Sequence, residues 1–164
     1  IDKSNNSLEI PITWQIPTLI LLTLIFNKKV VFRAFTIYLM IGLFISPVFH
    51  QGGSIGYLLT PNFGYLLGSY PLIKIIDNLN KKNKIKISNF IVNGILGIGA
   101  MHLTGIIYNL IQTIYYNQFN IFLYNLGKYS VSKIGYHLIM IIPLILVIKP
   151  IKHFKYRNIR VIGI

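Results

Sequence analysis

The chain contains no cysteine and only three acidic residues, Asp2, Glu9 and Asp77, among its 164 positions. The absence of cysteine excludes disulfide bonds and thiolate metal sites. So few carboxylates leave little capacity for acid–base or metal-assisted chemistry, and we find no nucleophile with a neighbouring base and no phosphate-binding Gly-Lys loop. We therefore expect no catalytic residue, no metal site and no cofactor, and a protein that is not an enzyme.

Hydrophobic residues are abundant: they make up 54% of the chain, and the mean hydropathy is +0.62. Several apolar segments approach the roughly 20 residues that a helix needs to cross a bilayer. We predict an all-α fold, a polytopic integral membrane helical bundle that forms one domain over residues 1–164. The five predicted spans are about 11–26, 30–46, 63–79, 88–116 and 134–148, with a glycine-rich loop over 47–62 and a polar, aromatic loop over 117–132.

The net charge is +13, from 16 basic residues. In a soluble protein this balance would suggest nucleic-acid binding. Here the basic residues cluster at the ends of apolar segments, as the positive-inside bias requires, and no nucleic-acid motif is present. Thirteen of them fall on one predicted side and three, Lys3, Lys128 and Lys133, on the other. We expect a lipid bilayer and no nucleic acid as partner, with the C-terminus cytoplasmic or stromal and both loops on the outer face.

The stretch from Ser46 to Gly68 holds no formal charge and contains five glycines. A loop at membrane depth must be buried in protein or line a cavity, because lipid cannot satisfy free backbone groups. Glycine permits positive φ and a close approach of the backbone to a ligand. We therefore favour a solute-binding loop over the alternative of a plain interhelical turn.

The fourth segment carries small residues at Gly94, Gly97, Gly99 and Gly105, and an imidazole at His102. Small residues in a membrane helix favour close helix–helix packing. A polar side chain at this depth usually meets a cavity or a partner. For His102 we expect a hydrogen bond across helices rather than metal ligation, because acids and thiols are missing nearby.

Three sequence blocks resemble one known family. Ile10-Pro11-Ile12-Thr13-Trp14-Gln15, Ser46-Pro47-Val48-Phe49-His50-Gln51-Gly52-Gly53 and Pro61-Asn62-Phe63-Gly64-Tyr65-Leu66-Leu67-Gly68 are similar, in order and spacing, to motifs of BioY. BioY is the biotin-specific substrate-binding (S) component of energy-coupling-factor (ECF) transporters. The resemblance implies the S-component fold, which has six membrane helices with both termini cytoplasmic. One helix normally precedes the first block, so the resemblance implies that this record lacks it and that the five spans are helices two to six.

The last helix departs from the family pattern, which begins Pro-Gly-Asp-Leu-Leu-Lys and uses its Asp and Lys to bind biotin. Alignment by distance to the basic tail places His137 at the Asp position and Met140 at the Lys position. Alignment on Lys133 instead places Ser130 at the Asp position, but it leaves a helix longer than we expect. We therefore prefer the first alignment, in which His137 could hydrogen-bond a ureido group from both ring nitrogens.

The resemblance implies an S component that captures biotin at the outer face for ATP-driven uptake. Its partners would be an ECF transmembrane coupling protein and ATPase subunits, in a bacterial plasma membrane or a plastid membrane. The alternatives are an S component for another small vitamin and a non-transporting membrane assembly subunit of an organellar complex. The substrate-binding residues that we predict are Gln15, Gly52, Gly53, Tyr57, Asn62, Tyr65 and His137.

Overall fold

The computed structural model describes residues 14–49, 52–80, 86–148 and 150, and these residues form helices and connecting turns without a β-strand. Phe49 and Gly52 form an isolated antiparallel bridge in one connection. A further helical segment, 141–148, follows the last named helix. The elements are α1 (Gln15–Ile25), α2 (Lys28–Phe44), the 3₁₀ helix η1 (Ile55–Leu59), α3 (Pro61–Leu67), α4 (Ser69–Asn80), α5 (Ile87–Tyr116), α6 (Phe119–Leu126), the π-helical turn η2 (Gly127–Val131) and α7 (Ser132–Ile139).

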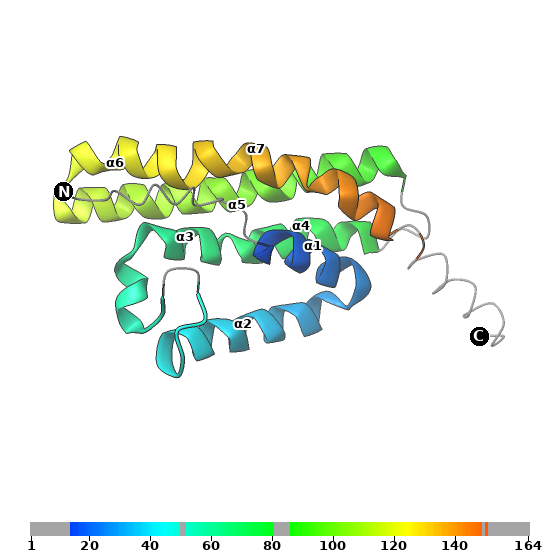
Figure 1. The fold of residues 1–164 in the computed structure, drawn as a ribbon, viewed down its shortest axis with the longest axis horizontal. Helices are drawn as coiled ribbons and strands as arrows, with labels where there is room; N and C mark the ends of the chain where they lie inside the picture. Colours follow the sequence, from blue (N-terminus) through cyan, green and yellow to red (C-terminus); the bar gives the residue numbers. More distant parts are fainter. Residues whose placement is uncertain (1–13, 50–51, 81–85, 149, 151–164) are drawn as a thin grey trace, which may run out of the picture.

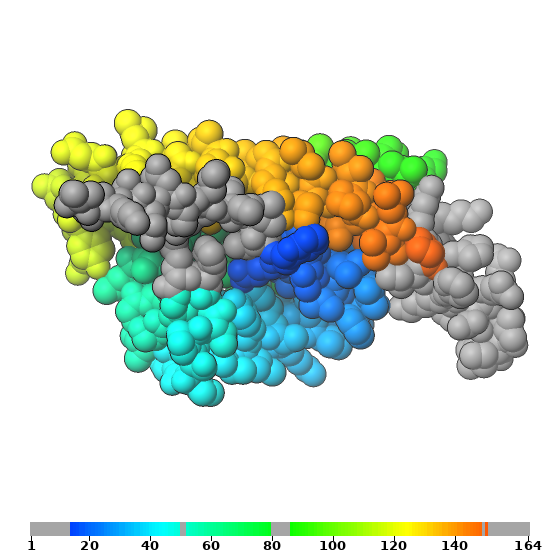
Figure 2. Space-filling model, in the orientation of Figure 1, coloured from blue at the N-terminus to red at the C-terminus, as the bar shows by residue number. Residues whose placement is uncertain are grey.

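The helices lie roughly side by side along the long axis of the molecule (Figure 1). The chain reverses after α5 at Asn117, which adopts the left-handed conformation that Asn tolerates well. The long C-terminal helix then runs back along α5, while α3 and α4 lie between α5 and α2. Figure 2 shows α1 on the face between α2 and the C-terminal part of the long helix. The α1–α2 turn and the start of α5 are at one end of the bundle, and the connection between α2 and α3 is at the other.

Short polar and proline signals set the helix starts. The side chain of Asn27 accepts a hydrogen bond from the backbone N–H of Lys29 at 3.1 Å and caps α2. Pro61 occupies the first turn of α3, where its missing N–H breaks no helical hydrogen bond. Pro17 likewise lies in the first turn of α1, which begins at Gln15. The predicted opening of this segment at Pro11 lies outside the described residues.

The centre of the bundle is α4. Leu72, Ile73, Ile76 and Leu79 have no exposed surface. Burial of such side chains contributes about 1.5–3 kcal/mol each relative to exposure to water. These four residues recur at three- and four-residue spacing and share one face of α4, whereas Lys74 and Asn78 are exposed on the opposite face.

Glycines allow α3 and α4 to approach α5 closely. A Cβ atom at Gly68, at the junction of α3 and α4, would lie 2.5 Å from the carbonyl oxygen of Met101 in α5. A Cβ atom at Gly97 would meet Leu72 at 3.3 Å. The expected packing role of the small residues in this segment is therefore confirmed for Gly97. Gly99 differs, because no atom of the described residues lies within 4 Å of its Cβ position.

The C-terminal third differs from the prediction of a loop over 117–132 and a helix over 134–148. One helix of 30 residues runs over Phe119–Ile148, interrupted only by η2 and a turn at Met140. The predicted loop was wrong, because two of its polar residues, Asn125 and Ser130, are hydrogen-bonded to α5 and are accommodated within a helix. The amide of Asn125 donates to Oδ1 of the buried Asn109 at 3.2 Å, and Ser130 is 5% exposed.

Two of the described helices, Ile87–Tyr116 and Phe119–Ile148, are long and apolar enough to cross a bilayer, and Gln15–Ile25 is a shorter apolar helix. The five predicted spans thus remain a prediction. Large apolar side chains are exposed along α5 and the long C-terminal helix, including Leu103, Ile111, Leu123, Ile142 and Leu146. Exposed apolar surface of this extent indicates contact with lipid or with another protein.

Candidate ligand-binding pocket

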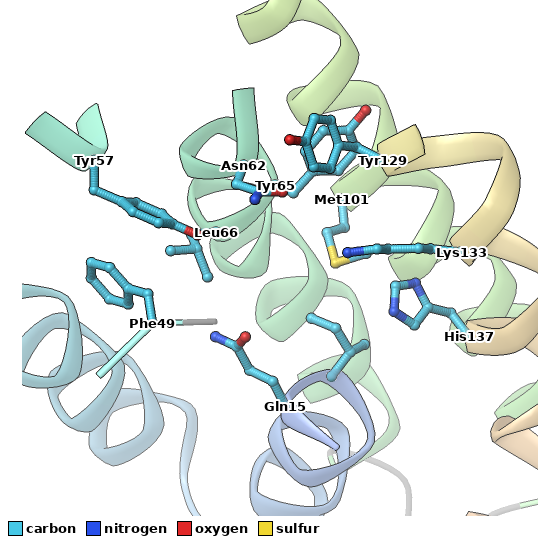
Figure 3. Close-up of a pocket in the computed structure, with 11 residues that line it drawn as sticks. Gln15, Phe49, Tyr57, Asn62, Tyr65, Leu66, Met101, Tyr129, Lys133 and His137 are labelled. Atoms are coloured by element: carbon cyan, nitrogen blue, oxygen red, sulfur yellow. The ribbon is translucent and has the colours of Figure 1, made fainter. Parts of the chain in front are cut away.

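A pocket opens between the helices, and the empty space inside it and at its open mouth is about 560 Å³. Figure 3 shows Gln15 of α1 on one side of the pocket and Lys133 and His137 of α7 on another. It is lined by Gln15 and Ile16 of α1, Phe49 of the α2–α3 connection, Tyr57 of η1, Asn62, Tyr65 and Leu66 of α3, Met101 of α5, Tyr129 of η2, and Lys133 and His137 of α7.

Five of the seven sequence-predicted site residues line this pocket: Gln15, Tyr57, Asn62, Tyr65 and His137. The two glycines, Gly52 and Gly53, are not among the lining residues. Gly52 has a φ of 124°, a conformation that side chains disfavour. Gly53 packs so that a Cβ atom would lie 2.6 Å from the carbonyl oxygen of Gly42. These glycines shape the connection rather than bring backbone to the pocket.

The connection presents Phe49 to the pocket through a tight turn. The backbone N–H of Phe49 donates to Gly52 at 2.9 Å, and the N–H of Gly52 donates to Phe49 at 3.0 Å. The ring of Phe49 lies over Gly42 of α2, where a Cβ atom would clash with it. It also contacts the rings of Tyr38, 5.4 Å between centroids, and Tyr57, 4.7 Å. This aromatic cluster fixes one apolar wall.

Tyr57 is 7% exposed although it lies outside the long helices. Burial, the largest cause, together with the neighbouring Tyr38 and Tyr129 raises the pKa of Tyr57 to about 12, and a hydrogen bond with Asn62 opposes the shift. The hydroxyl is therefore neutral at physiological pH and can donate as well as accept. The Tyr57–Asn62 pair supplies polar atoms at the aromatic wall.

Gln15 begins α1 on another side of the pocket. Its Nε2 donates to the hydroxyl of Tyr38 at 3.4 Å, and that hydroxyl donates to the carbonyl oxygen of Val48 at 3.3 Å. The amide oxygen of Gln15 is an acceptor beside these contacts. α1 and the α2–α3 connection are thus linked at the pocket.

Four polar side chains form a hydrogen-bonded chain at the wall opposite the aromatic cluster. The hydroxyl of Tyr65 lies 2.7 Å from Oγ of Ser130, and Oγ of Ser130 lies 3.2 Å from Nδ1 of His102. Nε2 of His102 lies 3.2 Å from Nδ1 of His137. The expectation that His102 hydrogen-bonds across helices is confirmed.

Lys133 and Tyr129 line the pocket but were not among the predicted site residues. Nζ of Lys133 lies 5.7 Å from the ring centroid of Tyr129, within reach of a cation–π contact. Tyr129, Lys133 and His137 are spaced by four residues, so they share one face of the helix. A signal for Lys133 was present in the sequence, in the alignment that places it at the family's Lys position.

That alignment was set aside because it required a long last helix, and the helix of 30 residues over Phe119–Ile148 removes the objection. Met140, which the preferred alignment placed at the Lys position, is not among the pocket-lining residues. No carboxylate is among the described residues that line the pocket, so Lys133 gives it a positive charge. The alignment on Lys133 therefore fits the geometry better, with Ser130 at the Asp position.

Comparison with known proteins identifies relatives over most of the chain. The model of the BioY family matches residues 4–151. A protein of Lysinibacillus sphaericus named "Probable biotin transporter BioY" is 33% identical over 103 residues, covering 60% of this chain and 51% of that protein. A protein of Cyanophora paradoxa named "Uncharacterized 21.2 kDa protein in psbX-ycf33 intergenic region" is 24% identical over 107 residues, covering 65% of this chain and 57% of that protein. No solved structure matches the chain.

The chain spans about half the length of the curated relatives it matches. The family model nevertheless covers all elements from α1 to the segment 141–148. The family and the long apolar helices together indicate a membrane protein. By this match, the chain is a member of the BioY family.

Proposed function

We propose that this protein is the substrate-binding S component of an ECF-type transporter and that it captures biotin in the pocket between α1, η1, α3, α5 and α7. It acts as a transport component and not as an enzyme. Membership of the BioY family and the relative named as a biotin transporter support the substrate class. The observation that supports this proposal most directly is the lining of the pocket, which combines one cation, amide and imidazole groups and a cluster of aromatic rings.

The chemistry of biotin fits these groups. Its valerate chain ends in a carboxylate, and Lys133 is the cation that would bind it by a charge-assisted hydrogen bond. Its fused rings are apolar except for the ureido group, and the rings of Phe49 and Tyr57 offer an apolar surface of matching character. The donors and acceptors for the ureido group come from the pocket-lining side chains of Gln15, Asn62, Tyr65 and His137.

The missing family Asp changes the charge of the site rather than its polarity. With Ser130 in its place, the wall near Lys133 carries a hydroxyl and two imidazoles instead of a carboxylate. Lys133 supplies a positive charge to the pocket, and this charge favours an anionic ligand. The absence of the family Asp is thus compatible with a ligand that carries a carboxylate.

The proposed orientation places the pocket toward the outer face. The starts of α2 and α5 lie at the end of the bundle opposite the α2–α3 connection (Figure 1). Lys28 and Lys29 begin α2 and Lys86 directly precedes α5, so the positive-inside bias assigns that end to the cytoplasm or stroma. Biotin would enter from the side of the connection. ATP-driven release would then require an ECF transmembrane coupling protein and ATPase subunits.

Calorimetric titration of the full-length protein in detergent with biotin tests the substrate. We expect saturable binding in the nanomolar range, about −12 kcal/mol, and weaker binding by the His137→Ala variant. Biotin amide, which lacks the carboxylate, should bind more weakly than biotin. A folded sample that gives no heat with biotin would refute the biotin assignment and favour another vitamin.

Reconstitution tests the transport partners separately. The full-length protein should co-purify with a coupling protein and ATPases, and proteoliposomes of this complex should accumulate labelled biotin only with ATP. Binding of biotin without any association with ATPases would contradict the ECF mechanism. The absence of both would favour a non-transporting assembly subunit.

A further inference from the structure

The hydrogen-bonded chain Tyr65–Ser130–His102–His137 begins and ends at the pocket. Tyr65 and His137 line the pocket, whereas Ser130 and His102 do not. The two middle members are 5% and 3% exposed. This hydrogen-bonded chain therefore joins two parts of the pocket wall through side chains that do not line the pocket.

The chemistry of its middle members restricts where the protons lie. A neutral imidazole has one N–H donor and one acceptor nitrogen, and a serine hydroxyl donates once. Oγ of Ser130 contacts the hydroxyl of Tyr65 and Nδ1 of His102 and, among the described residues, no third partner. Its single proton must go to one of the two, because a buried donor without an acceptor is costly.

In the first arrangement, Tyr65 donates to Ser130, and Ser130 donates to Nδ1 of His102. Nε2–H of His102 then donates to Nδ1 of His137. His137 carries its proton on Nε2, the ring nitrogen that does not take part in the hydrogen bond with His102. The pocket meets an acceptor oxygen at Tyr65 and a donor N–H at His137.

In the second arrangement every hydrogen bond is reversed. Nδ1–H of His137 donates to His102, Nδ1–H of His102 donates to Ser130, and Ser130 donates to the hydroxyl oxygen of Tyr65. The hydroxyl proton of Tyr65 is then directed to the ligand, and Nε2 of His137 is an acceptor. Each arrangement thus offers the pocket one donor and one acceptor, at opposite ends.

We propose that His102 and Ser130 act as specificity-determining residues: by linking Tyr65 to His137, they make these two pocket walls present one donor and one acceptor together, which selects a neutral urea- or amide-like group carrying both N–H and C=O. A group with donors only, or with acceptors only, satisfies one wall and opposes the other. This proposal rests on the proposed function for its ligand, and it adds residues that do not contact that ligand.

The hydrogen-bonded chain Tyr65–Ser130–His102–His137 also leads to a prediction that can be tested without a ligand. In both arrangements His102 and His137 carry the proton on the same ring nitrogen, either Nε2 on both or Nδ1 on both. A mixed pair would set two lone pairs or two N–H groups against each other across the 3.2 Å contact. ¹⁵N-histidine NMR of the full-length protein in detergent reports the tautomers, with signals assigned through His102→Gln and His137→Gln. Shared tautomers support the chain, and opposite tautomers overturn it.

A second experiment compares the binding of biotin with that of 2-iminobiotin, which has the same shape. At neutral pH 2-iminobiotin carries a guanidinium in place of the urea, so this group has N–H donors and no acceptor. Because both ligands carry the carboxylate, the ratio of the Kd of 2-iminobiotin to the Kd of biotin cancels the contact of Lys133 with that group. We expect Ser130→Ala and His102→Phe to lower this ratio by about tenfold, the factor for one lost hydrogen-bond preference. The control Tyr136→Phe removes a buried hydroxyl of the helix that carries Ser130, one that has no hydrogen-bond partner among the described residues. It should leave the ratio unchanged.

Ser130→Ala is the smaller change and keeps the test valid if His102→Phe does not fold. A ratio that stays at the wild-type value in a folded Ser130→Ala protein would overturn the proposal, as would an equal fall in Tyr136→Phe. A wild-type protein that binds neither ligand would refute biotin as the substrate, and with it the selection of a urea. Shared tautomers in that protein would still support the hydrogen-bonded chain.

Discussion

Gly105 of α5 lies against the ring of Tyr65, so closely that a Cβ atom at position 105 would overlap the ring. Tyr65 is a pocket-lining residue and also begins the chain of hydrogen bonds to Ser130. The absence of a side chain at Gly105 therefore sets the position of one pocket wall. The sequence predicted only helix packing for Gly105, but its contact with Tyr65 links that packing to the pocket.

Gly105→Ala should displace Tyr65 and weaken biotin binding. Overpacking of this kind costs about 1–3 kcal/mol, and we expect the loss in both thermal stability and affinity. Gly99→Ala on the same helix is the matched control, because no atom in the described part of the chain lies within 4 Å of its Cβ position. An affinity for biotin equal in both variants and in wild type would contradict the coupling between Gly105 and the pocket.

Lys133→Met should remove the charge-assisted contact with the carboxylate of biotin. Hydrogen bonds to charged groups contribute about 1.5–3 kcal/mol, so the Kd for biotin should rise about 10- to 100-fold, with little change for biotin amide. Lys128→Met is the control, because Lys128 lies over the rings of Tyr124 and Tyr129 but does not line the pocket. Equal losses in the two variants would indicate a general electrostatic effect instead.

Gly52→Ala should destabilise the turn that places Phe49 at the pocket. A side chain at a φ of 124° is strained, at a cost of about 1–3 kcal/mol. Gly56→Ala, in the neighbouring η1, is the control, because its Cβ position meets only Oγ of Ser54 at 3.6 Å. Thermal unfolding monitored by far-ultraviolet circular dichroism compares the unfolding midpoints of the two variants. A similar midpoint for both variants would show that the turn tolerates a side chain.

Tyr57 should make the protein sensitive to alkaline pH. Its pKa is raised from 10.0 to about 12 chiefly by burial, so the folded state holds the proton more tightly than the unfolded state does. The corresponding stability is complete below pH 10 and is lost as the pH rises toward 12. Tyr57→Phe should show a smaller loss of thermal stability over this window than wild type. Parallel pH profiles of the two proteins would contradict it.

The local sequence signals located much of the fold. α5 over Ile87–Tyr116 coincides within one residue with the predicted segment 88–116. Pro61 marks the start of α3, two residues before the predicted 63. These boundaries follow from proline, capping residues and apolar length, which act within one or two helical turns.

Some residues of the candidate site could be predicted from the sequence. Tyr57, Asn62 and Tyr65 follow a glycine-rich stretch whose lack of charge marks it as a lining segment, and all three reach the pocket. Lys133 was missed because the polar residues around it predicted a loop. Pairing across helices, such as Asn125 with Asn109, allows those residues to remain helical, and no local pattern records such a partner.

The sequence by itself determined the family, the all-helical class and most helix limits, because motif order, apolar length and proline positions are properties of neighbouring residues. Only the tertiary structure decided that residues 119–148 form one long helix, that Gly52 and Gly53 shape a turn beside the pocket, and that Lys133 lines it. The same holds for the contact of His102 with Ser130 and His137. These features depend on contacts between residues far apart in the sequence, and a buried polar group adopts the arrangement in which a distant residue supplies its hydrogen bond.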